Sequence, residues 1–392
     1  MMHLNGMHLV ITQRYLNIMI ITCIYWSIFG LHTYHMLKGC YMIYKPFQVQ
    51  RSWLTRNNKL NDKLDLEMIL GKSVVSNHPP ILLFPGLGAS KLMYQNKTIY
   101  PPTLFKYLTS YQDWKQKIIE YKNLSTLEFG NHESLNINVF FRKLNHYETI
   151  LRVPNVYPIP YDFRVLDEPE YYYSLFDKIR LYIESFDEPV FFVCHSTGGL
   201  VAHWFLHNQE KEWRDRYIKS VLYVNVPFGG LVTVLENCVK DDTKINRYIG
   251  RQIFRSLGAV VWNMPNTEYM GHSILFVNGN AVDDYMKYFK LYDIKKRYEN
   301  SKDVIHSFSQ SIDGVDTHVI YSITGQMKTP TSIHVDYFYD KKKGMKEMIH
   351  TEVGEGDGLV PLSSLLVPKK WDNPPLFHPM PNTEHSSILR DS

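Results

Sequence analysis

The sequence predicts an α/β fold in which short buried strands alternate with helices around a mostly parallel central sheet. Four apolar runs have the length of strands buried on both faces, and Gly or Pro soon follows each: 81–84, 191–194, 220–226 and 318–323. Helical periodicity marks three further stretches: 172–184, 200–208 and 282–289. Because strands that alternate with helices pair in parallel, these observations together predict the fold class.

The composition allows a large core and argues against several kinds of partner. The chain has 392 residues, 44% of them hydrophobic, which is enough for one large domain or two smaller ones. Its 43 basic and 39 acidic residues are nearly balanced, so we expect no nucleic acid partner. The run Lys341-Lys342-Lys343 is expected to be a solvated loop. Only Cys40 and Cys238 look free to pair, and no Cys or His spacing predicts a metal or another cofactor.

The N-terminal region has the pattern of a membrane anchor. Residues 15–37 carry no Asp, Glu, Lys or Arg, and about 20 mostly apolar residues suffice to span a bilayer. We therefore predict an anchor within residues 1–50, a juxtamembrane linker at 51–77 and a catalytic domain at 78–392. A cleaved signal peptide is the alternative. The predicted location is the endomembrane system as a single-pass protein, with the side of the membrane left open.

Two long stretches interrupt the alternation of strands and helices. Residues 99–147 place aromatic side chains, such as Phe105, Tyr107 and Trp114, among charges. Residues 231–270 contain a charged piece followed by Trp262. Both stretches are interpreted as insertions that lie above the sheet and outside its core.

The strongest candidate for chemistry is the stretch FFVCHSTGGLVAHWF, residues 191–205. An apolar run ends at Ser196, and a helical pattern follows it directly. The stretch approaches the pattern Gly-x-Ser-x-Gly, with the small Cys194 in place of the first glycine. In hydrolases of the α/β type, an acid and then a histidine follow the serine along the chain. Asp357 in GEGDGLVPLSS and His385 in EHSSIL have that order.

Each of these three residues also has a simpler interpretation. Ser196 could be an ordinary serine at a helix start, Asp357 a turn residue between glycines, and His385 one of 17 histidines. Acyl transfer further requires two N–H donors for the oxyanion. Thr197, directly after the serine, and Leu87, in the glycine-rich loop after the first strand, are the candidates. That loop lacks the Lys-Ser/Thr of a phosphate-binding loop, so nucleotide binding is not expected.

Eight motifs in order carry a resemblance to a known family. They are LLFPGLGASKL, IPYDFR, CHSTGG, NVPFGG, SLGAVVWNMP, YSITGQMKTP, GEGDGLVPLSS and EHSSIL, and they extend from 81 to 389. The chain resembles the lecithin:cholesterol acyltransferase family, which includes lysosomal phospholipase A2-type enzymes and phospholipid:diacylglycerol acyltransferases. The resemblance implies an α/β-hydrolase fold with cap and lid insertions. It also implies a catalytic triad of Ser196, Asp357 and His385, with Leu87 in the oxyanion loop.

The resemblance assigns roles to further residues. Tyr161, Asp162 and Arg164 would form a structural turn near the substrate pocket, with Arg164 supporting the fold. Trp262 would line the acyl region, and Lys240, Arg247 and Phe254 would belong to a mobile lid. The insertion that begins at 99 would be a cap that touches the membrane. The chain departs from the family at Cys194, Phe163 and Phe228, and the cap lacks a cysteine pair.

Together these observations predict a serine-dependent lipid O-acyltransferase or phospholipase A. Its partners would be a phospholipid acyl donor, a lipid alcohol acceptor such as a sterol or diacylglycerol, and a membrane surface, with water as a competing acceptor. No metal or other cofactor is predicted. One alternative is a plain lipase or esterase without acyl transfer. The other is a non-catalytic lipid-binding membrane protein that retains the fold.

Overall fold

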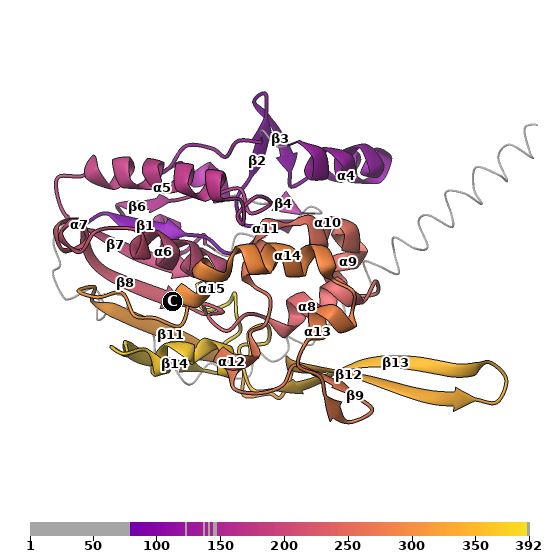
Figure 1. Ribbon diagram of the computed structural model, residues 1–392. Helices are drawn as coiled ribbons and strands as arrows, with labels where there is room; N and C mark the ends of the chain where they lie inside the picture. The colour runs from indigo at the N-terminus through magenta and orange to yellow at the C-terminus, as the bar shows by residue number, and fades with distance from the viewer. Residues whose placement is uncertain (1–78, 122–123, 136–137, 140–141, 144–146, 390–392) are drawn as a thin grey trace, which may run out of the picture. The chain divides into compact units, whose positions relative to one another are not determined.

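The computed structural model describes residues 79–389 except 122–123, 136–137, 140–141 and 144–146 (Figure 1). A six-stranded sheet forms its centre, in the order β14-β11-β8-β7-β1-β6, and every neighbouring pair is parallel. The strands are β1 (Ile81–Phe84), β6 (Val156–Pro158), β7 (Val190–His195), β8 (Ile218–Val224), β11 (Thr317–Ile323) and β14 (Leu376–Pro381). The fold is the α/β-hydrolase fold that the sequence predicts.

Four of the six strands follow the predicted apolar runs. The prediction at 81–84 coincides with β1, and those at 191–194 and 318–323 lie within β7 and β11. The run at 220–226 overlaps β8, which begins and ends two residues earlier. All four residues of β1 are buried, as expected for a strand covered on both faces. The outer strands β6 and β14 were not predicted.

Helices α5 (Pro169–Glu184) and α6 (Thr197–His207) overlap the predicted helices 172–184 and 200–208, and α7 (Lys211–Tyr217), which was not predicted, follows α6. The buried side chains of α5 recur at helical spacing: Tyr172, Leu175, Phe176, Ile179 and Ile183. Helix α6 packs on β1 and β7, and Gly198 permits its close approach. A Cβ atom at Gly198 would stand 2.4 Å from the carbonyl oxygens of both Phe84 and Pro85. The start of α6 is therefore held tightly against the loop that follows β1.

The first insertion begins with a small hairpin, and helices follow it. Its elements are β2 (Leu92–Tyr94), β3 (Lys97–Tyr100), α3 (Leu104–Thr109), α4 (Tyr111–Glu120), η1 (His132–Leu135), β4 (Asn138–Val139), β5 (Arg142–Lys143) and η2 (Ile150–Arg152). Trp114 is buried and its indole N–H donates to Ile99 O, so this ring is core and does not face lipid. Phe105, in contrast, is 75% exposed.

The second insertion is helical and contacts the first. It contains α8 (Val232–Val239), α9 (Lys244–Ile249), α10 (Arg251–Ser256), α11 (Gly258–Trp262) and α12 (Thr267–Met270). The hydroxyls of Tyr107 and Tyr111 donate to the carbonyl oxygens of Tyr248 and Ile249, at 2.8 and 3.1 Å. The chain continues through α13 (Tyr285–Tyr288), α14 (Tyr292–Asn300) and α15 (Lys302–Ser307). The predicted helix 282–289 shrinks to the four residues of α13, because Asp284 caps its start.

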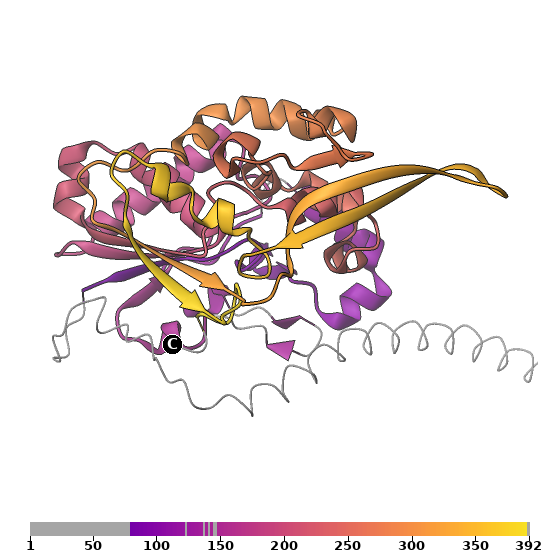
Figure 2. The same cartoon turned by 90° about the horizontal axis from the view of Figure 1, so that it is seen from below.

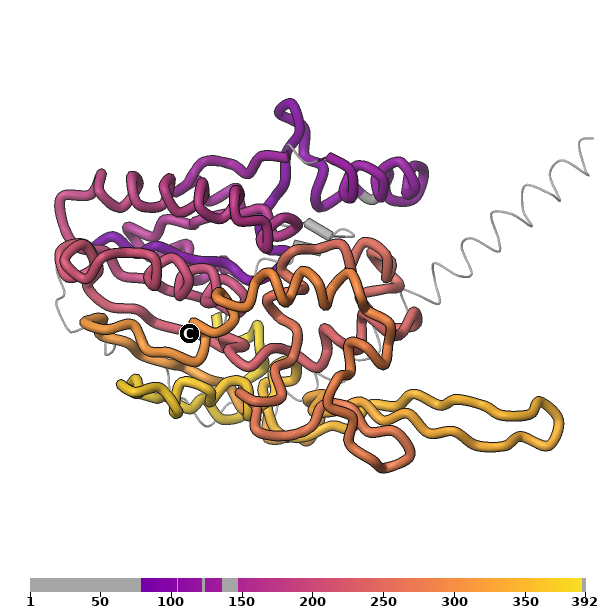
Figure 3. Tube along the Cα trace, in the orientation of Figure 1, coloured from indigo at the N-terminus to yellow at the C-terminus, as the bar shows by residue number. Residues whose placement is uncertain are grey.

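A second sheet has four strands in the order β10-β9-β12-β13. These are β9 (Leu275–Val277), β10 (Asn280–Ala281), β12 (Thr329–Asp340) and β13 (Gly344–Gly354), and α16 (Leu362–Leu365) and η3 (Val367–Lys370) come after them. Strands β12 and β13 form a long antiparallel hairpin that extends past the neighbouring helices, as Figures 1 and 2 show. The tube in Figure 3 follows its two strands side by side to the turn.

The predicted location as a single-pass membrane protein of the endomembrane system has to be corrected. Crossing a bilayer takes about 20 mostly apolar residues in one helix. Within the described part of the chain no helix is long and apolar enough, and α5, with 16 residues, carries several charges. The anchor segment 15–37 and the linker 51–77 lie outside the described residues. The structure therefore gives no support to a membrane anchor.

Candidate active site

Ser196 stands on a sharp turn between β7 and α6, at the carboxyl edge of the sheet. Its backbone angles, φ 54° and ψ −134°, are uncommon for a residue with a side chain. The turn is held because Ser196 N donates to Val224 O of the neighbouring strand at 3.0 Å. The side chain is only 6% exposed. Strain of this kind is typical of a nucleophile lifted out of a strand end.

The structure brings the three predicted triad residues together although they lie far apart along the chain. His385 Nε2 lies 3.0 Å from Ser196 Oγ, and His385 Nδ1 lies 2.6 Å from Asp357 Oδ2. Asp357 is fully buried and His385 nearly so. A serine, an imidazole and a carboxylate joined in this order can activate the hydroxyl for attack on an ester.

Backbone groups fix the orientation of Asp357. Its Oδ1 atom accepts hydrogen bonds from Leu359 N and Val360 N, at 2.9 and 2.7 Å, which leaves Oδ2 for the imidazole. His385 N also donates to Asp357 O at 2.9 Å. The loop of His385 is tied down further by an ion pair of 2.5 Å between Lys328 and Glu384. The acid and the histidine are therefore held as one unit.

Two residues that the sequence analysis missed connect this unit to the loop after β1. Tyr147 OH accepts the Gly86 N–H at 2.7 Å and lies 2.9 Å from His195 Nδ1. His195 Nε2 lies 3.1 Å from His385 O. All the contacts are satisfied together when Tyr147 donates to Nδ1 and neutral His195 donates from Nε2. The only sequence feature that could have indicated a role for His195 is its position directly before Ser196. No sequence feature indicated a role for Tyr147.

Asn225 is a third residue that the sequence analysis missed. Its amide Nδ2 donates to His385 O at 3.1 Å and to Ser322 Oγ at 3.0 Å. Its Oδ1 accepts from Ser322 N at 2.7 Å, which fixes the amide between β8 and β11. Asn225 has a positive φ of 50°, a conformation that asparagine tolerates better than most residues. The carbonyl of His385 thus contacts two side chains, those of His195 and Asn225.

The predicted oxyanion donors lie in the expected elements. A Cβ atom at Gly86 would stand 3.5 Å from Ser196 Oγ, so the loop after β1 runs directly beside the serine. The Gly86 N–H donates to Tyr147 OH and is therefore occupied. The N–H groups of Leu87 and Thr197 have no acceptor among the described residues, so they are free to bind an oxyanion. Thr197 is the first residue of α6, where N–H groups have no partner within the helix.

The turn residues Tyr161, Asp162 and Arg164 are buried supports near this loop. Tyr161 OH donates to Pro85 O at 2.9 Å, and burial keeps the pKa of this hydroxyl well above its usual value. Arg164 pairs with Asp162, with Nη2 2.5 Å from Oδ2. Its Nη1 donates to the carbonyl oxygens of Ile118 and Tyr121 at the end of α4. Arg164 therefore joins the first insertion to the core and does not reach Ser196.

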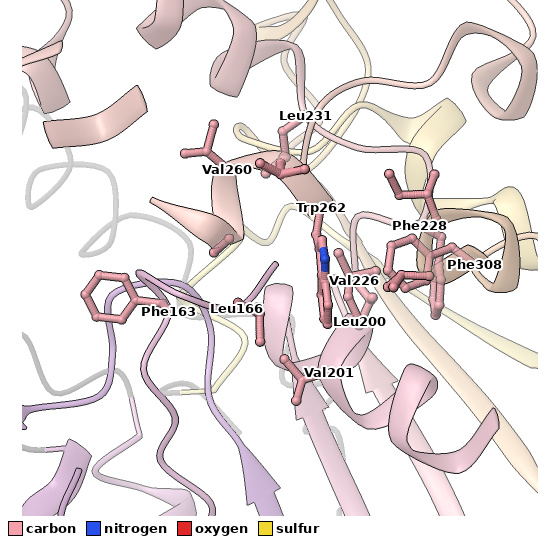
Figure 4. Close-up of a cluster of buried hydrophobic side chains, with 14 of the residues drawn as sticks. Phe163, Leu166, Leu200, Val201, Val226, Phe228, Leu231, Val260, Trp262 and Phe308 are labelled. Carbon is pink, nitrogen blue, oxygen red and sulfur yellow. The ribbon is translucent and has the colours of Figure 1, made fainter. Parts of the chain in front are cut away.

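The remaining predicted site residues occupy different environments. Trp262 is buried in an apolar cluster, and Figure 4 shows it among Leu200, Val226 and Phe308. In the predicted lid, Lys240 Nζ donates to Glu236 and to Thr351 at 2.9 and 2.8 Å, while Arg247 is exposed on α9. Phe254 is buried on α10, so its ring belongs to the packed interior and not to an exposed lid.

The two cysteines in the described region are buried free thiols. Burial raises the pKa of Cys194 well above its usual value and that of Cys238 to about 12. Cys238 is a free thiol among the described residues, and Cys40, the residue expected to be free to pair with it, lies outside them. In the described part of the chain, no cluster of three His, Cys, Asp or Glu residues could hold a metal ion.

A cavity of about 380 Å³ lies at the amino ends of β11 and β14, the edge of the sheet opposite Ser196.

Comparisons with known proteins find similarity to one family of enzymes. A model of the lecithin:cholesterol acyltransferase family matches residues 136–278. The lysosomal phospholipase A and acyltransferase of Homo sapiens is 26% identical over 287 residues, which cover 68% of this chain and 67% of that protein. The phosphatidylcholine-sterol acyltransferase of Gallus gallus is 27% identical over 236 residues, which cover 57% and 55%.

Among solved structures, one chain of a Tle4-Tli4 complex is 13% identical. The likeness covers 80% of this chain and 95% of that chain, with a TM-score of 0.49.

Proposed function

We propose that this chain, which is similar to the lecithin:cholesterol acyltransferase family, is a phospholipase A and lipid O-acyltransferase that works through Ser196. Two kinds of relative support the proposal by name, one a phospholipase A and acyltransferase and the other a phosphatidylcholine-sterol acyltransferase. The donor would be a glycerophospholipid, and the acceptor a lipid alcohol or water.

The single observation that carries the proposal is the chain of contacts from Ser196 through His385 to Asp357. Both contacts, 3.0 and 2.6 Å, lie within hydrogen-bonding distance. The imidazole can accept a proton on Nε2 while Asp357 holds Nδ1–H, which is the arrangement that general base catalysis requires. A serine without such partners would be a weak nucleophile at neutral pH.

The first half of the reaction forms an acyl-enzyme. Ser196 Oγ attacks the ester carbonyl of the phospholipid while His385 Nε2 takes the hydroxyl proton. The tetrahedral intermediate then collapses, the ester C–O bond breaks, and the imidazolium returns the proton to the departing lysophospholipid hydroxyl. Asp357 stabilises the imidazolium between these two steps. The fatty acyl chain remains esterified to Ser196.

The second half transfers the acyl chain to an acceptor. His385 removes the proton from the acceptor hydroxyl, whose oxygen attacks the acyl carbonyl, and the Ser196 oxygen leaves with that proton. Water as acceptor gives a free fatty acid, and a lipid alcohol gives a new ester. Because water is the competing nucleophile, the outcome depends on how well the covered site excludes it. The low exposure of Ser196 favours such exclusion.

Leu87 N and Thr197 N are the proposed donors to the oxyanion. Thr197 lies at the N-terminus of α6, where the helix dipole adds positive potential. Tyr147 and His195 are proposed to position this machinery, since their contacts join the Gly86 peptide to the backbone of His385. Tyr161 would hold the same loop from its other side through Pro85 O.

A product assay tests the proposal. The full chain is incubated with vesicles of phosphatidylcholine labelled in its acyl chains, with and without a sterol or diacylglycerol, and the lipids are separated. We expect lysophospholipid in every case and a labelled acyl ester when an acceptor is present. Ser196→Ala should form neither product. Release of fatty acid alone, whichever acceptor is present, would indicate a plain lipase and contradict the transferase half.

A separate experiment tests the alternative that the protein binds lipid without catalysing a reaction. A fluorophosphonate probe reacts with an activated serine and should label the parent protein but not Ser196→Ala. A protein that binds phospholipid vesicles yet neither reacts with the probe nor forms lysophospholipid would be a lipid-binding protein that has only the fold of the family. That pair of results would refute the proposed function.

A further inference from the structure

The end of the β12–β13 hairpin exposes apolar side chains that the catalytic site does not use. The body of the molecule braces the hairpin up to Tyr337, whose backbone N–H donates to Asn278 Oδ1 at 2.9 Å and whose hydroxyl lies 2.8 Å from Tyr288 OH. Beyond this point, the hydrogen bonds among the described residues join the hairpin to itself. We define the hairpin tip as residues 338–346.

The apolar residues of the tip lie on both faces of the ribbon. Tyr339 and Met345 are opposite each other in the ladder, so they share one face, and they are 70% and 66% exposed. Phe338, next to Tyr339 along the strand, points to the other face and is also exposed, as is Met348. Large exposed apolar groups gathered at one place usually mark a site of interaction.

The tip is also positively charged. Residues 339–346 contain four lysines, Lys341, Lys342, Lys343 and Lys346, and a single acidic residue, Asp340. The Asp340 carboxylate accepts hydrogen bonds from the backbone N–H groups of Lys342 and Lys343, at 2.8 and 2.9 Å, which fixes the turn. The side chains of Lys341, Lys342 and Lys343 are all exposed. Aromatic rings and Met beside lysines suit a bilayer interface that carries negative charge.

The root of the hairpin lies at the catalytic acid. Strand β13 ends at Gly354, three residues before Asp357, and Thr329, the first residue of β12, accepts the Gly358 N–H on Oγ1 at 2.9 Å. At about 3.3 Å per residue, the 12 residues of β12 place the tip roughly 35 to 40 Å from this root. A contact at the tip is thus connected to the active site by a continuous pair of hydrogen-bonded strands.

We propose that the hairpin tip, through Phe338, Tyr339, Met345 and the lysines 341–343, docks this protein on an anionic lipid surface. The rings and Met345 enter the headgroup region, and the lysine ammonium groups contact lipid phosphates and carboxylates. The docking is peripheral and holds the enzyme at the surface that contains its substrate, so the benefit to catalysis rests on the proposed function. The charge of the tip favours this occupant over a second copy of the chain, whose tip would carry the same charge.

Binding is measured on the full chain carrying Ser196→Ala, so that the vesicles are not consumed. Sedimentation with phosphatidylcholine vesicles is compared with vesicles that also contain phosphatidylserine. We expect tighter binding to the anionic vesicles, weakened by salt. Lys341→Gln, Lys342→Gln and Lys343→Gln should each lower the affinity about fivefold, and the triple variant on the order of 100-fold. Phe338→Ser, Tyr339→Ser and Met345→Ser together should also weaken binding.

A matched control changes equally exposed apolar residues far from the tip. Leu181 and Tyr292 are 68% and 60% exposed on α5 and α14. The variant with Leu181→Gln and Tyr292→Gln should bind anionic vesicles like its parent. Equal loss of binding in this control and in the tip variants would overturn the proposal. Parent-like binding by the tip variants would do the same, and so would a dimer in light scattering that the tip variants convert to monomer without any change in vesicle binding.

A fluorescent probe on the hairpin tip reports insertion of the tip into lipid directly, even if other parts of the chain also bind vesicles. An environment-sensitive dye is attached at Met345→Cys in a chain with Cys23→Ser and Cys40→Ser, because Cys194 and Cys238 are buried. Its emission should shift to the blue with phosphatidylserine vesicles and be quenched by brominated lipids. An unchanged emission would refute docking through the tip.

Activity separates failure of this inference from failure of the proposed function. On a water-soluble short-chain ester, the tip variants with an intact Ser196 should react as fast as the parent, whereas on anionic phospholipid vesicles they should be slower by about the loss in binding. A parent that hydrolyses neither substrate would refute the proposed function, while the sedimentation and dye measurements would still decide the docking proposal.

Discussion

The two sheets of the molecule differ in what covers them. In the central sheet, strands such as β1 are buried on every residue, and two of the proposed catalytic residues, Ser196 and His385, follow the carboxyl ends of β7 and β14. In the second sheet, β12 is buried near its start but exposed from Tyr337 onward. The first sheet holds Ser196 and His385 within hydrogen-bonding distance of each other, and the second presents side chains to the surroundings. Burial in the central sheet thus fixes the positions of side chains, whereas exposure in the second sheet leaves side chains available to contact a lipid surface, as proposed.

Asp357 lies where the two sheets meet. Thr324 N, just after β11 of the central sheet, donates to Gly356 O, and Thr329 of the hairpin accepts from Gly358 N. The acid is thereby fixed on both sides by different sheets. The comparison therefore predicts large effects for changes at the buried sheet edge and small effects on folding for changes at the hairpin tip.

The largest effect is expected from Ser196→Ala. Loss of the nucleophile should lower kcat by about 10⁴-fold or more, because the remaining groups of a triad act only through it. The fold should persist, since the change removes a single hydroxyl. Steady-state kinetics with phospholipid vesicles and circular dichroism measure the two effects. Ser185→Ala, an exposed serine at the end of α5, is the control and should keep full activity.

Arg164→Met should strongly destabilise the fold. It leaves Asp162 buried without its partner and frees two carbonyl oxygens at the end of α4, which should cost about 3–5 kcal/mol in the free energy of unfolding. Urea denaturation measures the cost. Arg152→Met removes an exposed ion pair with Glu148 and should cost less than about 1 kcal/mol. Similar values for the two variants would contradict the structural role of Arg164.

His203 should make stability fall in mild acid. Burial lowers the pKa of His203 to about 3, and its ring nitrogens contact Tyr223 OH and Ser307 O. The unfolded chain binds a proton near pH 6.5 while the folded chain does not, so the stabilisation is present above pH 6.5 and is lost as pH falls toward 3.

This loss is limited to about 1.4 kcal/mol per pH unit. In urea denaturation between pH 7 and 4.5, His203→Gln should show a shallower slope of unfolding free energy against pH than the parent. A His203→Gln slope equal to that of the parent would show that other groups cause the pH dependence.

Tyr147→Phe should impair catalysis more than stability. The change removes the acceptor of Gly86 N and the donor to His195, both beside Ser196, and should lower kcat about tenfold with KM little changed. A purely structural role would instead lower the melting temperature and leave kcat per folded molecule unchanged. Tyr107→Phe, which loses a hydrogen bond to Tyr248 O in the insertions, should retain kcat.

The smallest effect on folding is expected at the hairpin tip. The variant with Phe338→Ser, Tyr339→Ser and Met345→Ser changes only exposed side chains, so each should alter the free energy of unfolding by no more than about 0.5 kcal/mol. Thermal and urea unfolding measure it. Destabilisation of several kcal/mol would mean that the tip is packed and that the contrast between the two sheets is wrong.

Much of the fold could be predicted because buried strands have a simple pattern. The runs at 81–84 and 191–194 are apolar throughout and end at Pro or at the nucleophile turn, so their type and their end are both visible. Strand β14 has the sequence LFHPMP, and its two prolines argue against a strand in a sequence-based prediction. They are tolerated because β14 is an outer strand that pairs on one side only. The hairpin was missed because exposed Tyr, Phe and Met break the usual alternation of apolar and polar residues.

The order Ser, Asp, His along the chain, together with the family resemblance, predicted the triad residues that the structure brings together. The supporting contacts could not be predicted, because they depend on which backbone groups meet across the sheet edge. Nothing in the sequence around Tyr147 indicates that its hydroxyl reaches Gly86, 61 residues away. Nor did the charged stretch around Phe254, a predicted lid residue, indicate that its ring is buried on α10.

The most direct test of the account is to trap the acyl-enzyme. The protein is mixed with phosphatidylcholine, quenched in acid within the first turnover and analysed by peptide mass spectrometry. The proposed mechanism predicts one fatty acyl group on the peptide that contains Ser196, and none on that peptide in Ser196→Ala. Lysophospholipid formed at the parent rate by Ser196→Ala, or an acyl group found on a different residue, would contradict it.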